Sequence, residues 1–83
     1  MRVRESETKL VCRVTAEVLD ADPDALSERN RFIEDLGADS LELFEILTRI
    51  EEICHISFER AALERIRTIK DAAELVWEVE HIG

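Results

Sequence analysis

The fold of this chain is decided by residues 34–53, which read EDLGADSLELFEILTRIEEI. Asp39 and Glu42 have the three-residue spacing at which two side chains cap each other's backbone N–H groups at a helix start. Both carboxylates also favour the positive end of a helix dipole. Gly37 permits the tight backbone needed just before them. The stretch therefore predicts a loop that ends at Asp39 and a helix whose first residue is Ser40.

The predicted helix has two chemically different faces. Apolar residues recur at three- and four-residue spacing, which predicts a buried stripe of Leu43, Ile46, Leu47, Ile50, Ile53 and Cys54. The opposite stripe consists of Glu42, Glu45, Arg49 and Glu52. Leu41 and Phe44 belong cleanly to neither stripe and lie toward the carboxylate side. They either pack against the preceding loop or serve as contacts for a partner, and spacing alone leaves both alternatives open.

Three further helices are predicted around this one. The first runs from about Ser6 to Leu19 and ends before Pro23, because proline disfavours helical geometry in the residue before it. A short helix is expected near Glu59–Arg65. A last helix follows Thr68, which has an acid, Asp71, at the capping-box spacing. The long connection that precedes Asp39 has four expected apolar anchors, Leu26, Phe32, Ile33 and Leu36, while Ser27 is expected to cap a short turn.

These elements predict a fold and a core. The fold is an all-α, small four-helix bundle, with three longer helices and one short one, in a single domain over residues 1–83. At 83 residues its core is thin. The core positions expected outside residues 34–53 are Val3, Leu10, Val11, Val14, Val18, Ile56, Phe58, Ala62, Leu63, Ile66, Ala72, Leu75, Val76 and Val79, with Ile69 and Ile82 as flanks, Glu7 as the polar residue of the first stripe and Trp77 partly exposed.

The charge excludes one large class of partner. The net charge is −9, which opposes binding to nucleic acid phosphates. Residues 34–59 hold eight acidic residues against one basic residue, Arg49. Such a field is typical either of a solvated helix face or of a surface that attracts basic partners. No apolar run is long enough for a membrane span, and the N-terminus lacks the apolar stretch of a signal peptide, so a soluble cytoplasmic protein is expected. We also expect a monomer, and Met1 and the compact length favour a free-standing protein over a domain excised from a megasynthase.

Catalytic and metal chemistry find little support in the sequence. Ser40 lacks the Gly-x-Ser-x-Gly pattern of a nucleophile elbow, and His55 and His81 lie outside any catalytic motif. Cys12 and Cys54 are far apart and are expected to be buried thiols rather than zinc ligands. No glycine-rich phosphate loop exists, because the chain has only two glycines. We therefore expect no catalytic residues and no metal site; a small hydrolase is the weakest alternative.

Residues 32–42, FIEDLGADSLE, closely resemble the phosphopantetheine attachment site of acyl carrier proteins. The similarity continues through Glu45 and residues 51–52, and it resumes at residues 56–58 and 66–72. The resemblance implies that a phosphopantetheinyl transferase attaches the 4′-phosphopantetheine arm of coenzyme A to Ser40. The arm would carry acyl groups as thioesters in fatty-acid, polyketide or related biosynthesis. The competing hypothesis is a cofactor-free acidic module that binds a basic partner.

The resemblance also implies a partner surface. Its expected members are Asp39, Leu41, Glu42, Phe44, Glu45 and Glu52, which would meet basic docking patches on transferases, acyl-loading enzymes, synthases and acyltransferases. Arg49 departs from the family pattern, as does Ser57-Phe58, where many members have a proline. Because an apolar stripe begins just below Ser40, we further expect an acyl chain to fold back between helices, in a pocket lined by Ile46, Leu47, Ile50 and Leu63.

Overall fold

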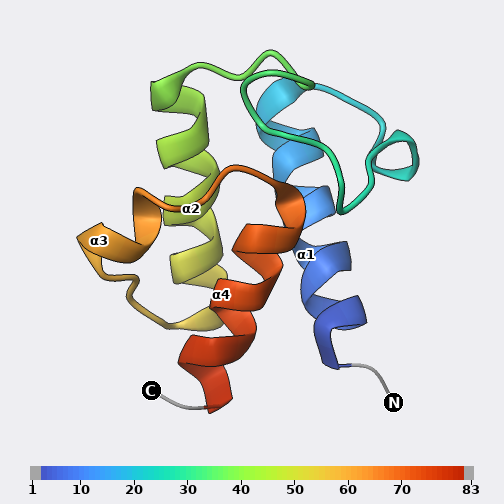
Figure 1. Ribbon diagram of the computed structural model, residues 1–83. Helices are drawn as coiled ribbons and strands as arrows, with labels where there is room; N and C mark the ends of the chain where they lie inside the picture. Colours follow the sequence, from blue (N-terminus) through green and yellow to red (C-terminus); the bar gives the residue numbers. More distant parts are fainter. Residues whose placement is uncertain (1–2, 82–83) are drawn as a thin grey trace.

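A computed structural model describes residues 3–81, with side chains from Ser6 onward. Helix α1 spans Val3–Leu19, a single 3₁₀ turn η1 spans Pro23–Ala25, and α2 spans Ser40–Cys54. Helix α3, Arg60–Leu63, is one turn long, and α4 spans Ile69–His81 (Figure 1). Within these residues no β-strand forms; one isolated antiparallel bridge joins Arg31 and Thr68. The predicted all-α bundle of three longer helices and one short one is confirmed.

The helix boundaries follow the capping signals closely. α1 begins three residues earlier than predicted and ends where Asp20 takes a left-handed conformation, with φ of 56°. The start of α4 is the predicted box: the Thr68 N–H donates to Asp71 Oδ2 and the Asp71 N–H donates to Thr68 Oγ1, both at 3.1 Å. α3 occupies the middle of its predicted range, with Glu59 as its N-cap residue. Side-chain capping therefore fixes the start of α4 but not that of α3, whose N-cap residue makes no side-chain capping hydrogen bond.

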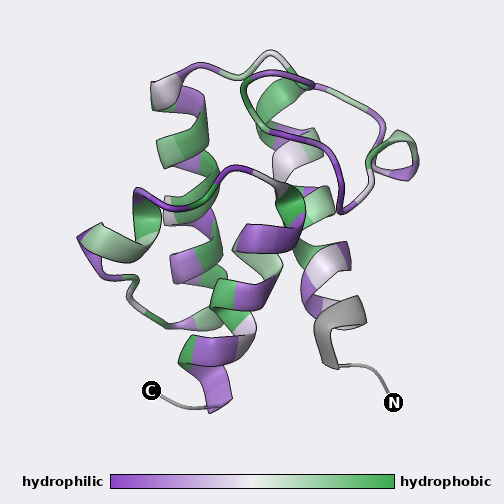
Figure 2. Cartoon of the chain, in the orientation of Figure 1, coloured by the Kyte–Doolittle hydropathy of each residue, from purple (hydrophilic) through white to green (hydrophobic). Residues whose placement is uncertain are grey.

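The core lies where α1 packs against both α2 and α4. Figure 2 shows hydrophobic and hydrophilic residues interleaved around each longer helix, as amphipathic packing requires. The largest fully buried side chains are Val11, Val14, Thr15, Phe32, Ile46, Ile50, Ile69 and Val76. Ile69, predicted to flank the core, is thus inside it, as is Ala73, which was not predicted. Val3 and Ile82 lie outside the residues whose side chains are described.

Two predicted core positions are wrong. Ile33 is 49% exposed, because Phe32 takes the single inward position in this part of the connection and its neighbour points away. Ile53 is 48% exposed. It lies in the last turn of α2, about 60° around the helix from Ile50, at the edge of the buried stripe. Leu26 and Leu36 are half-buried against the core, as expected of loop anchors.

The two cysteines are free thiols in different surroundings. Cys12 is buried, as predicted, whereas Cys54 is only half-buried at the end of α2. Burial raises the pKa of both thiols. Each therefore stays protonated and unreactive at neutral pH, which supports a packing role. Among the described residues no cluster of histidine, cysteine or acidic side chains is suited to a metal ion.

Candidate functional site

The start of α2 is held by a reciprocal capping box. The Glu42 N–H donates to Asp39 Oδ1 at 2.8 Å, and the Asp39 N–H donates to Glu42 Oε1 at 3.0 Å. Ser40 is the first helical residue, as predicted, and it is exposed. The box uses two of the four N–H groups that a helix start leaves without a partner. The Ser40 and Leu41 N–H groups make no hydrogen bond within the described part of the chain.

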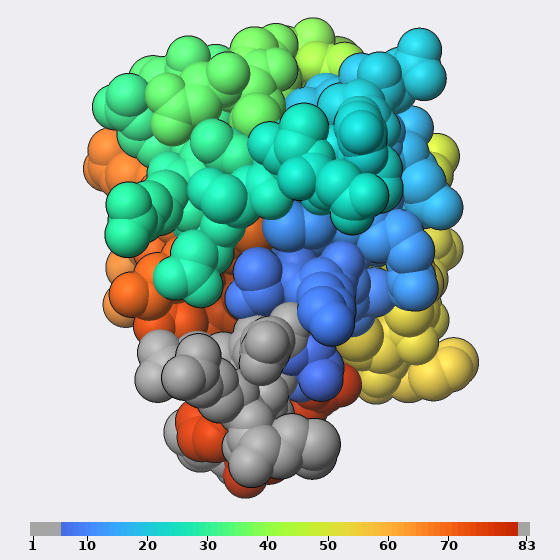
Figure 3. All heavy atoms as spheres, turned by 90° about the vertical axis from the view of Figure 1, so that its right-hand side faces the viewer, coloured from blue at the N-terminus to red at the C-terminus, as the bar shows by residue number. Residues whose placement is uncertain are grey.

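The connection before α2 is hydrogen-bonded to the segment that leads into α4. The Phe32 N–H donates to the Arg67 carbonyl at 2.9 Å, and the Ile69 N–H donates to the Asn30 carbonyl at 3.0 Å. The Ala38 N–H donates to the Phe32 carbonyl at 3.0 Å. Figure 3 shows the connection lying above α1, where it covers the upper part of the face drawn in that view. Because Phe32 and Ala38 are both buried, the chain reaches Asp39 from a fixed position.

Gly37 makes the turn that leads into the box. Its φ is +72°, in the left-handed region of backbone conformation that residues with a Cβ adopt only with strain. A Cβ added there would meet nothing within 4 Å, so the requirement is conformational rather than steric. The loop therefore positions Ser40 at an exposed corner, at the junction of a fixed connection and a fifteen-residue helix.

No histidine is placed to activate the Ser40 hydroxyl. His55 caps the other end of α2, about 22 Å away along a fifteen-residue helix. His81 lies at the end of α4, where its ring stacks on Trp77 with centroids 4.7 Å apart. A serine nucleophile requires a base within hydrogen-bond reach. Within the described residues, the geometry therefore opposes a hydrolytic triad at Ser40.

Leu41 and Phe44 are exposed on α2. Their exposed fractions are 79% and 60%, the two largest among the big apolar residues of the described chain. Packing against the connection therefore does not account for them, and the partner contact expected of Leu41 and Phe44 stays a prediction. We call the surface formed by Leu41, Glu42, Phe44, Glu45, Arg49 and Glu52 the outer face of α2.

The acids of α2 differ in what they already bind. Glu42 belongs to the capping box, and Glu45 accepts a hydrogen bond from Arg49 at 2.7 Å. Glu51 Oε2 accepts a hydrogen bond from the Phe58 N–H at 2.7 Å and so fixes the turn after α2. Glu52 is exposed. No local pattern in the sequence indicates the structural role of Glu51, because its partner is seven residues away. The four-residue spacing of Glu45 and Arg49, by contrast, is one at which a helical ion pair can be predicted.

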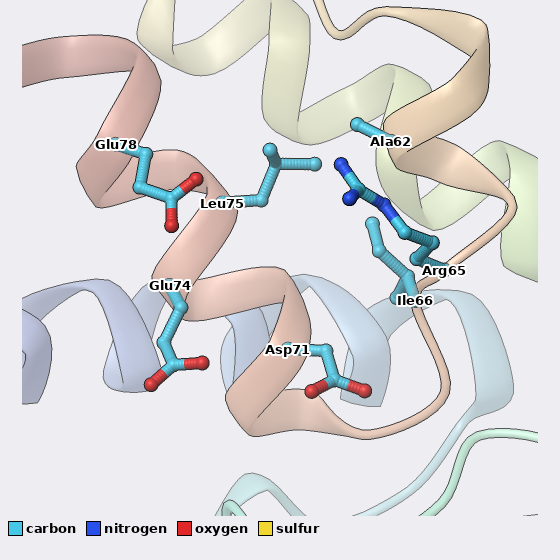
Figure 4. Close-up of a pocket in the computed structure, with 7 residues that line it drawn as sticks. All are labelled: Ala62, Arg65, Ile66, Asp71, Glu74, Leu75 and Glu78. Carbon is cyan, nitrogen blue, oxygen red and sulfur yellow. The ribbon is translucent and has the colours of Figure 1, made fainter. Parts of the chain in front are cut away.

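The residues predicted to line an acyl-chain pocket lie in or beside the core. Ile46 and Ile50 are fully buried, Leu47 is 3% exposed, and Leu63 is half-buried. A hollow of about 230 Å³ opens elsewhere, between the end of α3 and the outer side of α4 (Figure 4). It is lined by Ala62, Arg65, Ile66, Asp71, Glu74, Leu75 and Glu78. The acyl-chain pocket therefore stays a prediction.

Comparison with known proteins decides the family. A family model described as "Phosphopantetheine attachment site" matches residues 9–76. The chain belongs to the acyl carrier protein family. It is 41% identical over 68 residues to the "Acyl carrier protein" of Caulobacter vibrioides (strain NA1000 / CB15N), covering 82% of this chain and 87% of that protein. The "Acyl carrier protein" of Sulfurovum sp. (strain NBC37-1) is 38% identical over 69 residues, covering 83% and 92% of the two chains.

Family membership implies a 4′-phosphopantetheine prosthetic group. The residues present fit such a group: an exposed hydroxyl stands at a helix start with two uncommitted N–H groups, which suits a phosphodiester anion. The carboxylates of Asp39 and Glu42 each accept a hydrogen bond from the backbone N–H of the other residue. When bound, the group supplies a thiol that holds acyl chains as thioesters, and the protein serves as a carrier rather than a catalyst. None of the helices in residues 3–81 combines the length and apolar character needed to cross a membrane.

Proposed function

We propose that Ser40 is the residue that receives the 4′-phosphopantetheine arm. The observation that supports this most strongly is its position, exposed at the first residue of α2 and held there by the Asp39–Glu42 box. A phosphopantetheinyl transferase would join the Ser40 oxygen to the phosphorus of the arm. The pyrophosphate bond of coenzyme A would break, and its nucleotide half would leave.

The other three serines are poorer candidates. Ser6 lies outside the residues that match the family. The Ser27 hydroxyl accepts a hydrogen bond from the Arg29 N–H at 3.3 Å, in a turn of the connection. Ser57 lies in the connection between α2 and α3, three residues before a helix that is only one turn long. Among the four serines, only Ser40 is both exposed and the first residue of a long helix.

The outer face of α2, together with Asp39, is proposed to dock the enzymes that act on this carrier. Transferases and synthases are general partners of the family, and basic docking patches would complement the acids here. Leu41 and Phe44 would supply apolar contact next to Ser40. We also propose that the chain acts as a monomeric single domain, in the cytoplasm, where coenzyme A-dependent biosynthesis takes place.

Intact-mass measurement tests the proposed function. Incubation with coenzyme A and a broad-specificity transferase should add the mass of one arm to the wild-type chain and none to Ser40→Ala. Absence of any added mass, with a transferase that modifies a known carrier in the same tube, would favour the cofactor-free interaction module instead.

A further inference from the structure

Arg49 is the one lysine or arginine in α2, and it is paired within its own helix. Its Nη2 lies 2.7 Å from Oε2 of Glu45, one turn earlier. Both side chains remain open to solvent, with 44% of Arg49 and 50% of Glu45 exposed. The pair therefore stands on the outer face of α2, where an approaching enzyme meets it directly.

The pair divides the acidic outer face into two ends. Glu42 lies at the end near Ser40, and Glu52 lies one turn beyond Arg49. Between them, the charge of Glu45 is offset by the guanidinium. A uniformly basic patch that docked along this face would bring a cation toward Arg49. Like charges placed opposite each other at an interface slow association and discriminate between partners.

The pair is also easy to open. An exposed ion pair of this kind contributes only about 0.2–1 kcal/mol. A partner that places a carboxylate beside the guanidinium and a cation beside Glu45 would therefore replace one pair with two at little cost. The order of charges along the outer face of α2, negative at Glu42 and Glu45, positive at Arg49 and negative again at Glu52, distinguishes such a partner from a wholly basic one.

We propose that Arg49 is a specificity-determining residue for the enzymes that dock on α2. Arg49 disfavours partners whose docking patch is wholly basic and favours partners that present a carboxylate opposite it, between cations that face Glu45 and Glu52. This inference rests on the proposed function, since it concerns enzymes that act at Ser40.

The first test uses a broad-specificity transferase with a basic docking patch and the unmodified full chain. We compare kcat/KM for the wild type, Arg49→Gln and Arg13→Gln; the last removes the same charge from an exposed position on α1. Arg49→Gln should raise kcat/KM by roughly three- to ten-fold at low ionic strength, and the gain should shrink as salt is added. Arg13→Gln should change it by less than about two-fold. Equal effects of the two variants, or no gain for Arg49→Gln, would overturn the inference.

The second test addresses the carboxylate. Each basic residue of the transferase's docking patch is changed in turn to glutamate. For each enzyme variant, kcat/KM is measured with the wild-type carrier and with Arg49→Gln as substrates. At least one enzyme variant should prefer the wild type, reversing the original order. If none reverses it, the proposed complementarity is wrong. If no chain gains an arm in either test, the proposed function fails and the inference with it; if all chains are modified at one rate, only the inference fails.

Discussion

Asp39 and Glu42 each accept a hydrogen bond from the other's backbone N–H, at 2.8 Å and 3.0 Å, with Ser40 between them. These two acids therefore have a structural task in addition to any role in recognition. A substitution at either one changes the helix start as well as the surface charge. Pairing each variant with one that changes only a single property separates the two effects.

Removal of the N-cap side chain should weaken the start of α2. Asp39→Ala is expected to lower the free energy of unfolding by about 1 kcal/mol, because the Glu42 N–H loses its acceptor. Asp39→Asn keeps a side-chain oxygen in the same position and should lose less than about half of that. Urea denaturation measures both values. Equal losses for the two variants would mean that the carboxylate charge, rather than the cap, stabilises the helix.

Recognition by charge is best tested at Glu52, which takes part neither in the capping box nor in the Arg49 pair. Glu52→Lys should lower kcat/KM for modification by a transferase with a basic patch, by roughly three- to ten-fold at low ionic strength. The loss should diminish as salt screens the exposed charges. Glu17→Lys, an equal change at an exposed position on α1, is the control. Matching losses for the two variants would remove Glu52 from the docking surface.

Glu7 makes the stability depend on pH. Its side chain is buried, and its Oε1 has no hydrogen-bond partner in the described residues. Burial raises the pKa of this carboxyl, and the nearby Glu80 adds to the rise, whereas a hydrogen bond to its own backbone and the nearby His81 oppose it. Because the folded-state pKa exceeds the unfolded value, Glu7 contributes most at acid pH, and the contribution is lost as pH rises through the folded-state pKa.

Replacing Glu7 by its neutral analogue should therefore help at neutral pH. Glu7→Gln is expected to raise the free energy of unfolding near pH 7 by up to about 1 kcal/mol, or a few degrees in Tm, with a smaller effect near pH 4. Thermal melts at the two pH values measure the difference, and Glu17→Gln, on the exposed side of α1, controls for net charge. The same change in Tm at both pH values would contradict this assignment.

Acylation should stabilise the bundle in proportion to chain length if the acyl group folds back beside Ile46, Leu47 and Ile50. Each methylene taken out of water contributes at most about 0.8 kcal/mol, less whatever repacking the core requires. The melting temperatures of proteins loaded with short and medium chains should therefore rise with length above that of the unacylated arm. A Tm that is independent of length would place the chain in solvent.

The parts of the fold that the sequence predicts well are those that depend on neighbouring residues. The Asp39–Glu42 and Thr68–Asp71 boxes are three-residue relationships, and the buried stripe through Ile46 and Ile50 follows from helical spacing. The hydrogen bond between Phe32 and Arg67 joins residues that are far apart in sequence, so no local pattern indicated how the connection is fixed. The exposure of Ile33 and Ile53 likewise depends on which elements cover them.

The candidate site divides in the same way. The location of Ser40 at the helix start was predictable from spacing, whereas the attachment of a phosphopantetheine arm was inferred from the family resemblance. The Glu45–Arg49 pair was visible in principle as a four-residue spacing. By contrast, the bond between Glu51 and the Phe58 N–H depends on a turn that folds back on α2, and only the structure assigns it.

Peptide mapping of the modified protein shows directly whether Ser40 carries the arm. Wild type, Ser40→Ala, Ser27→Ala and Ser57→Ala are incubated with coenzyme A and a broad-specificity transferase, then digested and analysed by mass spectrometry. We expect one arm on the peptide that contains Ser40 in wild type, Ser27→Ala and Ser57→Ala, and no arm on Ser40→Ala, whose melting curve should show a folded protein. An arm on any other residue, or an arm retained by Ser40→Ala, would contradict the claim.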